Sequence, residues 1–113
     1  MSTPLASATT LGNAAAVAKV NQLKAQPRSQ GEASFFFYDA HFKNAAVKIL
    51  PGEYFVDQED LLVMTTLGSC IAACLWDRVA KVGGMNHFML PEGNGDSGRY
   101  GSFAMELLIN EMM

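Results

Sequence analysis

The sequence predicts an α+β domain, and three observations support this class. Apolar runs rich in strand-forming residues follow one another between residues 47 and 89, separated by short polar or Gly- and Pro-containing turns. Residues 103–113 are largely apolar and are preceded by Ser102, a residue type that caps helices, so a helix is expected there. The chain has 113 residues, enough for one domain with a core but not for two.

The N-terminal residues 1–33 are rich in Ala, Ser, Thr and Gln and are expected to form a flexible tail. Residues 14–24 have a weak helical period, but the apolar face is mostly alanine, so a docking helix is the alternative. The ordered domain is expected over residues 34–113. Within it, the aromatic cluster 35–38 is expected to pack in the core or at a sheet edge rather than to form a binding patch.

The first strands are expected over 47–50, 54–56 and 61–67, with a Pro-Gly turn at 51–53. The acidic segment 57–60 lacks the spacing and the glycine of a calcium loop. We therefore interpret it as a solvent-facing turn.

The runs 71–76 and 82–89 predict an antiparallel hairpin, because the segment between them is the only polar break. With the loop centred near residues 78–79, Cys70 lies opposite His87 or one place from it. Opposed residues share a face of the sheet with Cβ atoms about 4.5–5.5 Å apart. A thiol to imidazole hydrogen bond is then within reach, although a slip of one residue would separate the two faces.

A cysteine beside a histidine is a nucleophile beside a base. A free thiol has a pKa of about 8.5, and a neighbouring imidazolium lowers such a value by several units. Gly68 and Ser69 precede Cys70, and glycine allows a tight turn whose amide N–H groups could form an oxyanion hole. On the residues alone, a buried apolar cysteine and an unrelated histidine remain the alternative.

Four motifs carry a resemblance to a known family: they lie at 66–70, 73–77, 83–91 and 99–111. They occur in the order and at the spacing of the CheD family of chemoreceptor glutamine deamidases, which the chain resembles from about Val47 to its end. The resemblance implies a cysteine-hydrolase-like α/β/β layered sandwich of mixed sheets flanked by helices.

The resemblance also implies an activity and its residues. The activity is hydrolysis of receptor glutamine side chains to glutamate with release of ammonia, through a thioester on Cys70 with His87 as general base and acid. The family's third catalytic residue is a threonine a few places before the cysteine. Thr65 is the preferred candidate, Thr66 lies in the same neighbourhood, and Met64 fills one of the possible alignments.

Expected partners follow from the same resemblance: chemoreceptor helices and, as a further candidate, a CheC-type phosphatase. The alternative function is a non-catalytic or dual-role module that docks onto such a phosphatase or onto the receptor. A cysteine protease or a transglutaminase-like enzyme would use the same pair of residues. The proposed chemistry needs neither a metal nor an organic cofactor.

Composition narrows the remaining classes. The net charge of −3 gives no basic footprint for nucleic acid, and no apolar run approaches the roughly 18 residues of a membrane span. No secretory signal is recognised at the N-terminus. Cys70 and Cys74 on one strand would be about 13 Å apart, too far for a disulfide. Free thiols fit a cytoplasmic location.

The helix expected at 103–113 has apolar residues on more than one face and no C-terminal cap. The family domain continues with further strands, so we expect the C-terminal portion of the family fold to be absent from this chain. The helix should then expose an apolar patch, and residues 1–113 alone should be aggregation-prone or partly molten.

Overall fold

The computed structural model describes residues 4–89 and 96–113, with side chains for 13–89 and 103–113. The described residues form an α+β fold, as predicted, with two helices and two small sheets. In chain order the elements are α1 (Pro4–Ala25), β1 (Phe35–Asp39), β2 (Asn44–Lys48), β3 (Tyr54–Asp57), β4 (Leu62–Met64), β5 (Cys70–Asp77), β6 (Val82–Met89) and α2 (Asp96–Met112).

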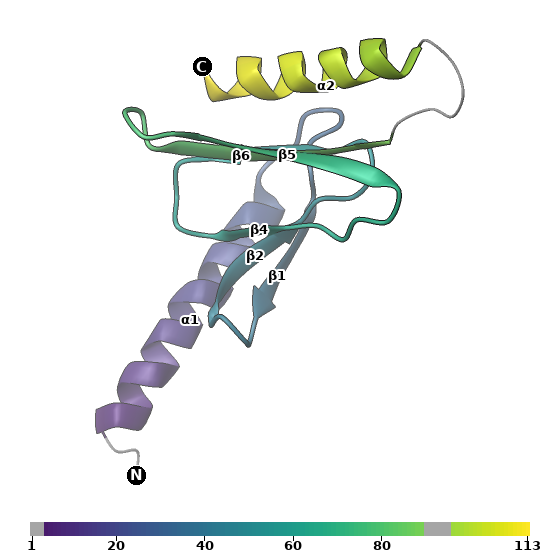
Figure 1. The fold of residues 1–113 in the computed structure, drawn as a ribbon. Coiled ribbons are helices and arrows are strands. Elements are labelled where there is room, and N and C mark those ends of the chain that lie inside the picture. The colour runs from purple at the N-terminus through teal and green to yellow at the C-terminus, as the bar shows by residue number, and fades with distance from the viewer. Residues whose placement is uncertain (1–3, 90–95) are drawn as a thin grey trace.

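The two sheets are three-stranded and pack face to face. The first has the order β1-β2-β4, with β1 and β2 antiparallel and β2 and β4 parallel. The second has the order β3-β6-β5 and is antiparallel throughout. Figure 1 shows α2 on one side of the second sheet and the first sheet on the other. This arrangement agrees with the layered sandwich of mixed sheets that the sequence implied.

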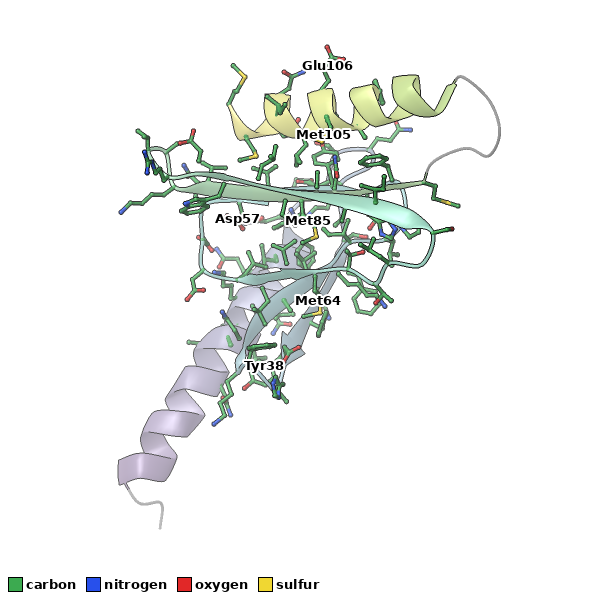
Figure 2. All side chains as sticks on the ribbon, in the orientation of Figure 1. Tyr38, Asp57, Met64, Met85, Met105 and Glu106 are labelled. Atoms are coloured by element: carbon green, nitrogen blue, oxygen red, sulfur yellow. The ribbon has the colours of Figure 1, made fainter. Side chains whose placement is uncertain are left out.

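The core fills the space between the sheets. Phe36 from β1 and Phe55 from β3 meet edge to face, with ring centroids 5.6 Å apart, and Met85 from β6 packs against the same cluster. Figure 2 shows Met85 between the two sheets and Glu106 on the solvent side of α2. The aromatic cluster therefore supplies core packing through Phe36, whereas Phe35 on the opposite face of β1 is 51% exposed.

The N-terminal segment differs from the predicted flexible tail. The structure has the alternative, a docked helix: Val20 and Leu23 of α1 join the same core as Phe36, and Asn13 accepts a 2.7 Å hydrogen bond from the Tyr38 hydroxyl. The alanines on this face have small side chains, so the helix can approach the sheet closely. Val20 and Leu23, one turn apart, then reach the core. The sequence pattern underestimates this contact because alanine adds little to an apolar period.

Helix α2 begins at Asp96 rather than at residue 103. Gly98 and Gly101 lower helix propensity, which is why the sequence placed the start later. The helix lies over β6 and β3 and buries Leu108 completely, whereas Phe103 and Ile109 are exposed, as expected for a helix that is apolar on more than one face. Among the described helices, none is long and apolar enough to cross a membrane.

Candidate functional site

The β5–β6 hairpin has a register two residues away from the predicted one. Cys70 pairs with Met89, and His87 pairs with Ala72. The shift arises at the turn, where the Asp77 carboxylate accepts hydrogen bonds from the N–H groups of Val79 and Ala80. This cap makes a four-residue loop beyond the closing pair Asp77–Val82, so the hairpin centre lies further along the chain than we expected.

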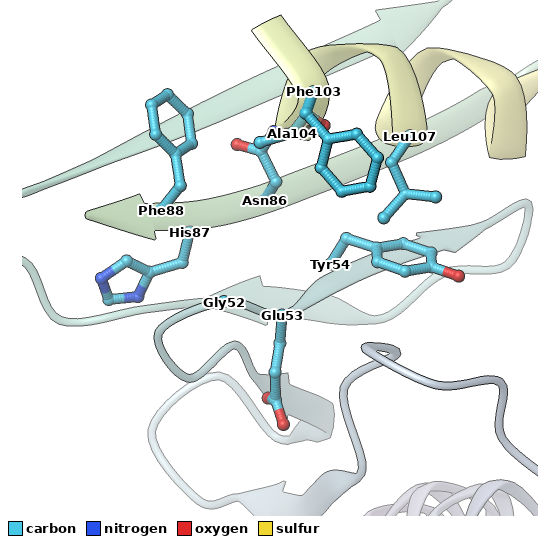
Figure 3. Close-up of a pocket in the computed structure, with 9 residues that line it drawn as sticks. All are labelled: Gly52, Glu53, Tyr54, Asn86, His87, Phe88, Phe103, Ala104 and Leu107. Carbon is cyan, nitrogen blue, oxygen red and sulfur yellow. Dashed lines mark hydrogen bonds between the residues drawn. The ribbon is translucent and has the colours of Figure 1, made fainter. Parts of the chain in front are cut away.

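The prediction that Cys70 lies opposite His87, or one place off, is therefore wrong, but the shared face is retained. A shift of two residues keeps both side chains on one side of the sheet, and the two residues become diagonal neighbours, a relation with typical separations of about 7–8 Å. No hydrogen bond joins them among the described residues. Figure 3 shows the His87 ring on the side of β6 opposite to Asn86 and Phe88, the side that faces the first sheet.

Thr65 reaches His87 because β2 and β4 run parallel. Their pairing continues past both strand ends, where the N–H of Ile49 donates to the carbonyl of Met64 at 2.8 Å. The next residue, Thr65, then donates its hydroxyl to the Ile49 carbonyl at 2.7 Å and lies 2.8 Å from His87 Nδ1. Of the candidate residues at 64–66, Thr65 is thus the one that contacts the histidine.

These contacts favour the His87 tautomer that is protonated at Nδ1. A threonine hydroxyl has one proton, and here it is donated to Ile49, so Thr65 Oγ1 accepts from Nδ1–H. The Ile49 carbonyl, 3.4 Å from Nδ1, favours the same protonation. The lone pair is then on Nε2, which is buried and has no hydrogen-bond partner among the described residues. His87 itself is only 3% exposed.

The segment before the cysteine lies at the surface. Gly68 and Ser69 are exposed, and their backbone N–H groups donate to none of the described backbone groups. The unusual glycine conformation that we expected is not present: Gly68 does not have positive φ, and an added Cβ would meet nothing within 4 Å. The backbone conformation at position 68 therefore does not require glycine. The absence of a side chain at Gly68 only leaves this part of the surface open.

Both cysteines are free, as predicted, and they differ in exposure. Cys70 is half-buried and Cys74 is exposed. Cys74 lines an open hollow between the sheets together with Trp76 and Met85. Accessibility alone would therefore make Cys74 the more reactive thiol.

A second, mostly apolar pocket lies under α2, and the residues that line it include Asn86 and His87 of β6. Tyr54, Phe103 and Leu107 form much of its wall. Burial, and secondarily the carboxylates of Glu111 and Glu32, raise the pKa of the Tyr54 hydroxyl above its ordinary value. At neutral pH Tyr54 is therefore a neutral part of the wall.

Asn86 fastens α2 to the sheet beside this pocket. It is 2% exposed, donates to the Ala104 carbonyl at 3.2 Å and accepts from the Ala73 N–H at 2.9 Å. The bonds of Asn86 therefore connect β6, the strand that contains His87, to both α2 and β5. No group of three His, Cys, Asp or Glu side chains suited to a metal ion occurs within the described part of the chain.

Comparison with known proteins gives relatives that are named as probable chemoreceptor glutamine deamidases. The chain is 64% identical over 100 residues to the probable chemoreceptor glutamine deamidase CheD 1 of Albidiferax ferrireducens, covering 87% of this chain and 43% of that protein. It is 56% identical over 84 residues to a protein of the same name from Shewanella oneidensis, covering 68% and 41%. A probable chemoreceptor glutamine deamidase CheD of Janthinobacterium sp. (strain Marseille) is 53% identical over 88 residues, covering 72% and 43%.

The chain spans less than half the length of these curated relatives. No family model and no solved structure matches it.

Proposed function

The chain belongs to the CheD family, and from this premise we propose that the protein hydrolyses glutamine side chains of chemoreceptors to glutamate and releases ammonia. One observation carries the assignment of residues. His87 shares a sheet face with Cys70, is bonded through Nδ1 to Thr65, and has an unpartnered Nε2. This is the order of nucleophile, base and orienting group in a catalytic triad.

The reaction proceeds through a thioester. Cys70 gives its thiol proton to His87 Nε2 and attacks the carboxamide carbon, and the backbone N–H groups of Ser69 and Cys70 stabilise the oxyanion that forms. The C–N bond then breaks as protonated His87 gives its Nε2 proton to the departing nitrogen, which leaves as ammonia. Neutral His87 next takes a proton from water, which attacks the thioester and releases glutamate and the thiolate. Gly68 leaves the approach to these groups open.

The Nδ1 bond to Thr65 keeps the imidazole in one orientation and one tautomer through both steps. Since Cys70 and His87 are diagonal rather than opposed, a change of Cys70 rotamer or a small strand movement completes the pair when substrate binds. Catalytic hydrogen bonds are often long in the absence of substrate.

The proposed substrate surface is a receptor helix, and the proposed compartment is the cytoplasm, which suits two free thiols. A module that docks onto a CheC-type phosphatase or onto the receptor without catalysis is the alternative function. It predicts binding without turnover, so the following experiment separates the two.

The test is mass spectrometry of receptor fragments incubated with the intact protein. We expect conversion of glutamine to glutamate, loss of conversion in Cys70→Ala, and retention in the matched variant Cys74→Ala. Backbone cleavage would indicate a protease, and incorporation of an added amine would indicate a transferase. Binding with no conversion by the unmodified protein would contradict the deamidase proposal.

Alkylation tests which thiol is activated. Cys74 is the exposed thiol, so exposure alone predicts that iodoacetamide labels it first. We expect Cys70 to react first, with loss of activity, because the proposed base His87 shares its sheet face and can accept the thiol proton. Peptide mapping after brief labelling measures the order. Labelling of Cys74 first, with activity retained, would reverse the roles of the two cysteines.

A further inference from the structure

A tight turn next to β3 holds the backbone of His87. Glu53 N–H donates to the Leu50 carbonyl at 2.9 Å, which closes a turn with Pro51 and Gly52 at its centre. Gly52 has φ of +86°, a conformation in which glycine is strongly preferred. The Gly52 N–H donates to the His87 carbonyl at 2.7 Å, and the His87 N–H donates to the Glu53 carbonyl at 3.0 Å. Two residues of the turn thus oppose one histidine, which is the pattern of a glycine bulge.

The Glu53 side chain forms a hydrogen bond with the backbone of the same turn. Its Oε1 accepts a hydrogen bond from the Leu50 N–H at 2.9 Å. That N–H belongs to the peptide group whose carbonyl is the oxygen of Ile49. The Ile49 oxygen in turn accepts from Thr65 and lies 3.4 Å from His87 Nδ1. A single peptide group therefore separates the Glu53 carboxylate from the groups that orient His87.

Hydrogen bonds at the two ends of a peptide group strengthen each other, because each polarises the group in the same direction. A carboxylate on the N–H makes the Ile49 carbonyl a stronger acceptor, and it also fixes the direction in which that carbonyl points. Figure 3 shows Glu53 and the His87 ring on the same side of the sheet.

We propose that Glu53 is a positioning residue for His87: through the Ile49–Leu50 peptide it holds Nδ1 protonated and leaves Nε2 free for the reaction. Glu53 touches none of the reacting atoms. The proposal rests on the deamidase function, but its structural part concerns the tautomer of His87 and can be measured without turnover.

The test compares Glu53→Ala with Glu53→Gln in the intact protein. Glutamine keeps an oxygen that accepts from Leu50, whereas alanine removes it. The matched control is Glu106→Ala, which removes an exposed carboxylate on the solvent side of α2. The readouts are the ¹⁵N chemical shifts of the His87 ring, which report the protonated nitrogen, and kcat and KM for receptor deamidation.

We expect Glu53→Ala to lower kcat about 10- to 100-fold with little change in KM, since a misplaced catalytic group costs this much. The ring shifts should move toward a mixture of tautomers. Glu53→Gln should restore most of the rate and the shifts of the unmodified protein, and Glu106→Ala should change neither.

Unchanged His87 shifts in Glu53→Ala would overturn the proposal, as would a glutamine variant as impaired as the alanine variant. If the unmodified protein has no deamidase activity, the proposed function fails. The ¹⁵N shifts still decide the role of Glu53 in that case.

Discussion

The two ring nitrogens of His87 have opposite surroundings. Nδ1 is bonded to Thr65, whereas Nε2 is buried without a partner among the described residues. A buried polar atom left unbonded costs about 1–3 kcal/mol, and atoms of this kind in native proteins call for an explanation such as a catalytic role. The unbonded Nε2 is therefore the atom expected to hold the transferred proton.

Replacement of Thr65 tests how this arrangement is maintained. Thr65→Val keeps the shape of the side chain but removes the hydroxyl, so the His87 ring loses its orienting partner. We expect the deamidation rate to fall about 10- to 100-fold, less than the roughly 10²- to 10⁴-fold that a positioned acid or base contributes, because Thr65 orients His87 and transfers no proton itself. Thr65→Ser should retain most of the rate. Kinetics on a receptor fragment measure both variants.

Thr66→Val is the matched control, because Thr66 is exposed and adjacent in sequence. Its rate should equal that of the unmodified protein. A larger loss in Thr66→Val than in Thr65→Val would show that the wrong threonine has been assigned.

At the scale of single residues, the family resemblance narrowed the proposed third member of the site to 64–66 and favoured Thr65, but it could not show which residue contacts His87. The selection depends on the parallel pairing of β2 with β4, which places Ile49 beside Thr65. Such a pairing joins segments that are distant in the chain. No local pattern in either segment encodes it.

At the scale of elements, the turn of the β5–β6 hairpin sets the register of the two strands and therefore the relative positions of Cys70 and His87. Both strands were predictable from apolar runs and the polar break between them. The register was not, because the Asp77 carboxylate caps two N–H groups and sets the loop length. The predicted register was wrong by two residues. Because side chains alternate between the faces of a strand, Cys70 and His87 still lie on the same face, and they remain the candidate pair.

The contact between β6 and α2 leaves little room for a side chain at Gly84. A Cβ at Gly84 would lie 3.0 Å from Leu108 Cδ1 and 3.1 Å from Val56 Cγ2. Overfilling a packed contact costs about 1–3 kcal/mol, so we expect Gly84→Ala to lower the free energy of unfolding by that amount in denaturant titration.

Gly83→Ala is the comparison on the neighbouring position and the opposite face. There an added Cβ would meet the Trp76 ring at 3.3 Å, and this side chain is 66% exposed and can move aside. We expect a change within about 0.5 kcal/mol, as for surface substitutions. Equal losses in both variants would mean that the space under α2 does not limit the packing.

At the scale of the whole molecule, the sequence predicted the class and most strands, gave the docked helix α1 only as the alternative, and assigned no strand to β1. The aromatic run of β1 was assigned to packing without a secondary structure, although its alternating burial, with Phe35 exposed and Phe36 buried, is that of a strand. The docked helix α1 was only the alternative because an alanine face has little apolar contrast. Its stability comes from contact with the core, which tertiary structure alone supplies.

Because α1 packs on the core through only part of its surface, substitutions at two of its apolar residues should have different effects on the free energy of unfolding. Leu23 is 5% exposed and belongs to the core cluster, whereas Val17 is 43% exposed. Leu23→Ala should lower the free energy of unfolding by about 2–5 kcal/mol, because it removes buried volume. Val17→Ala should change it by no more than about 0.5 kcal/mol. Chemical denaturation of the intact protein measures both. If residues 1–33 were a loosely ordered tail, as the sequence suggested, both variants would unfold at the same denaturant concentration as the unmodified protein.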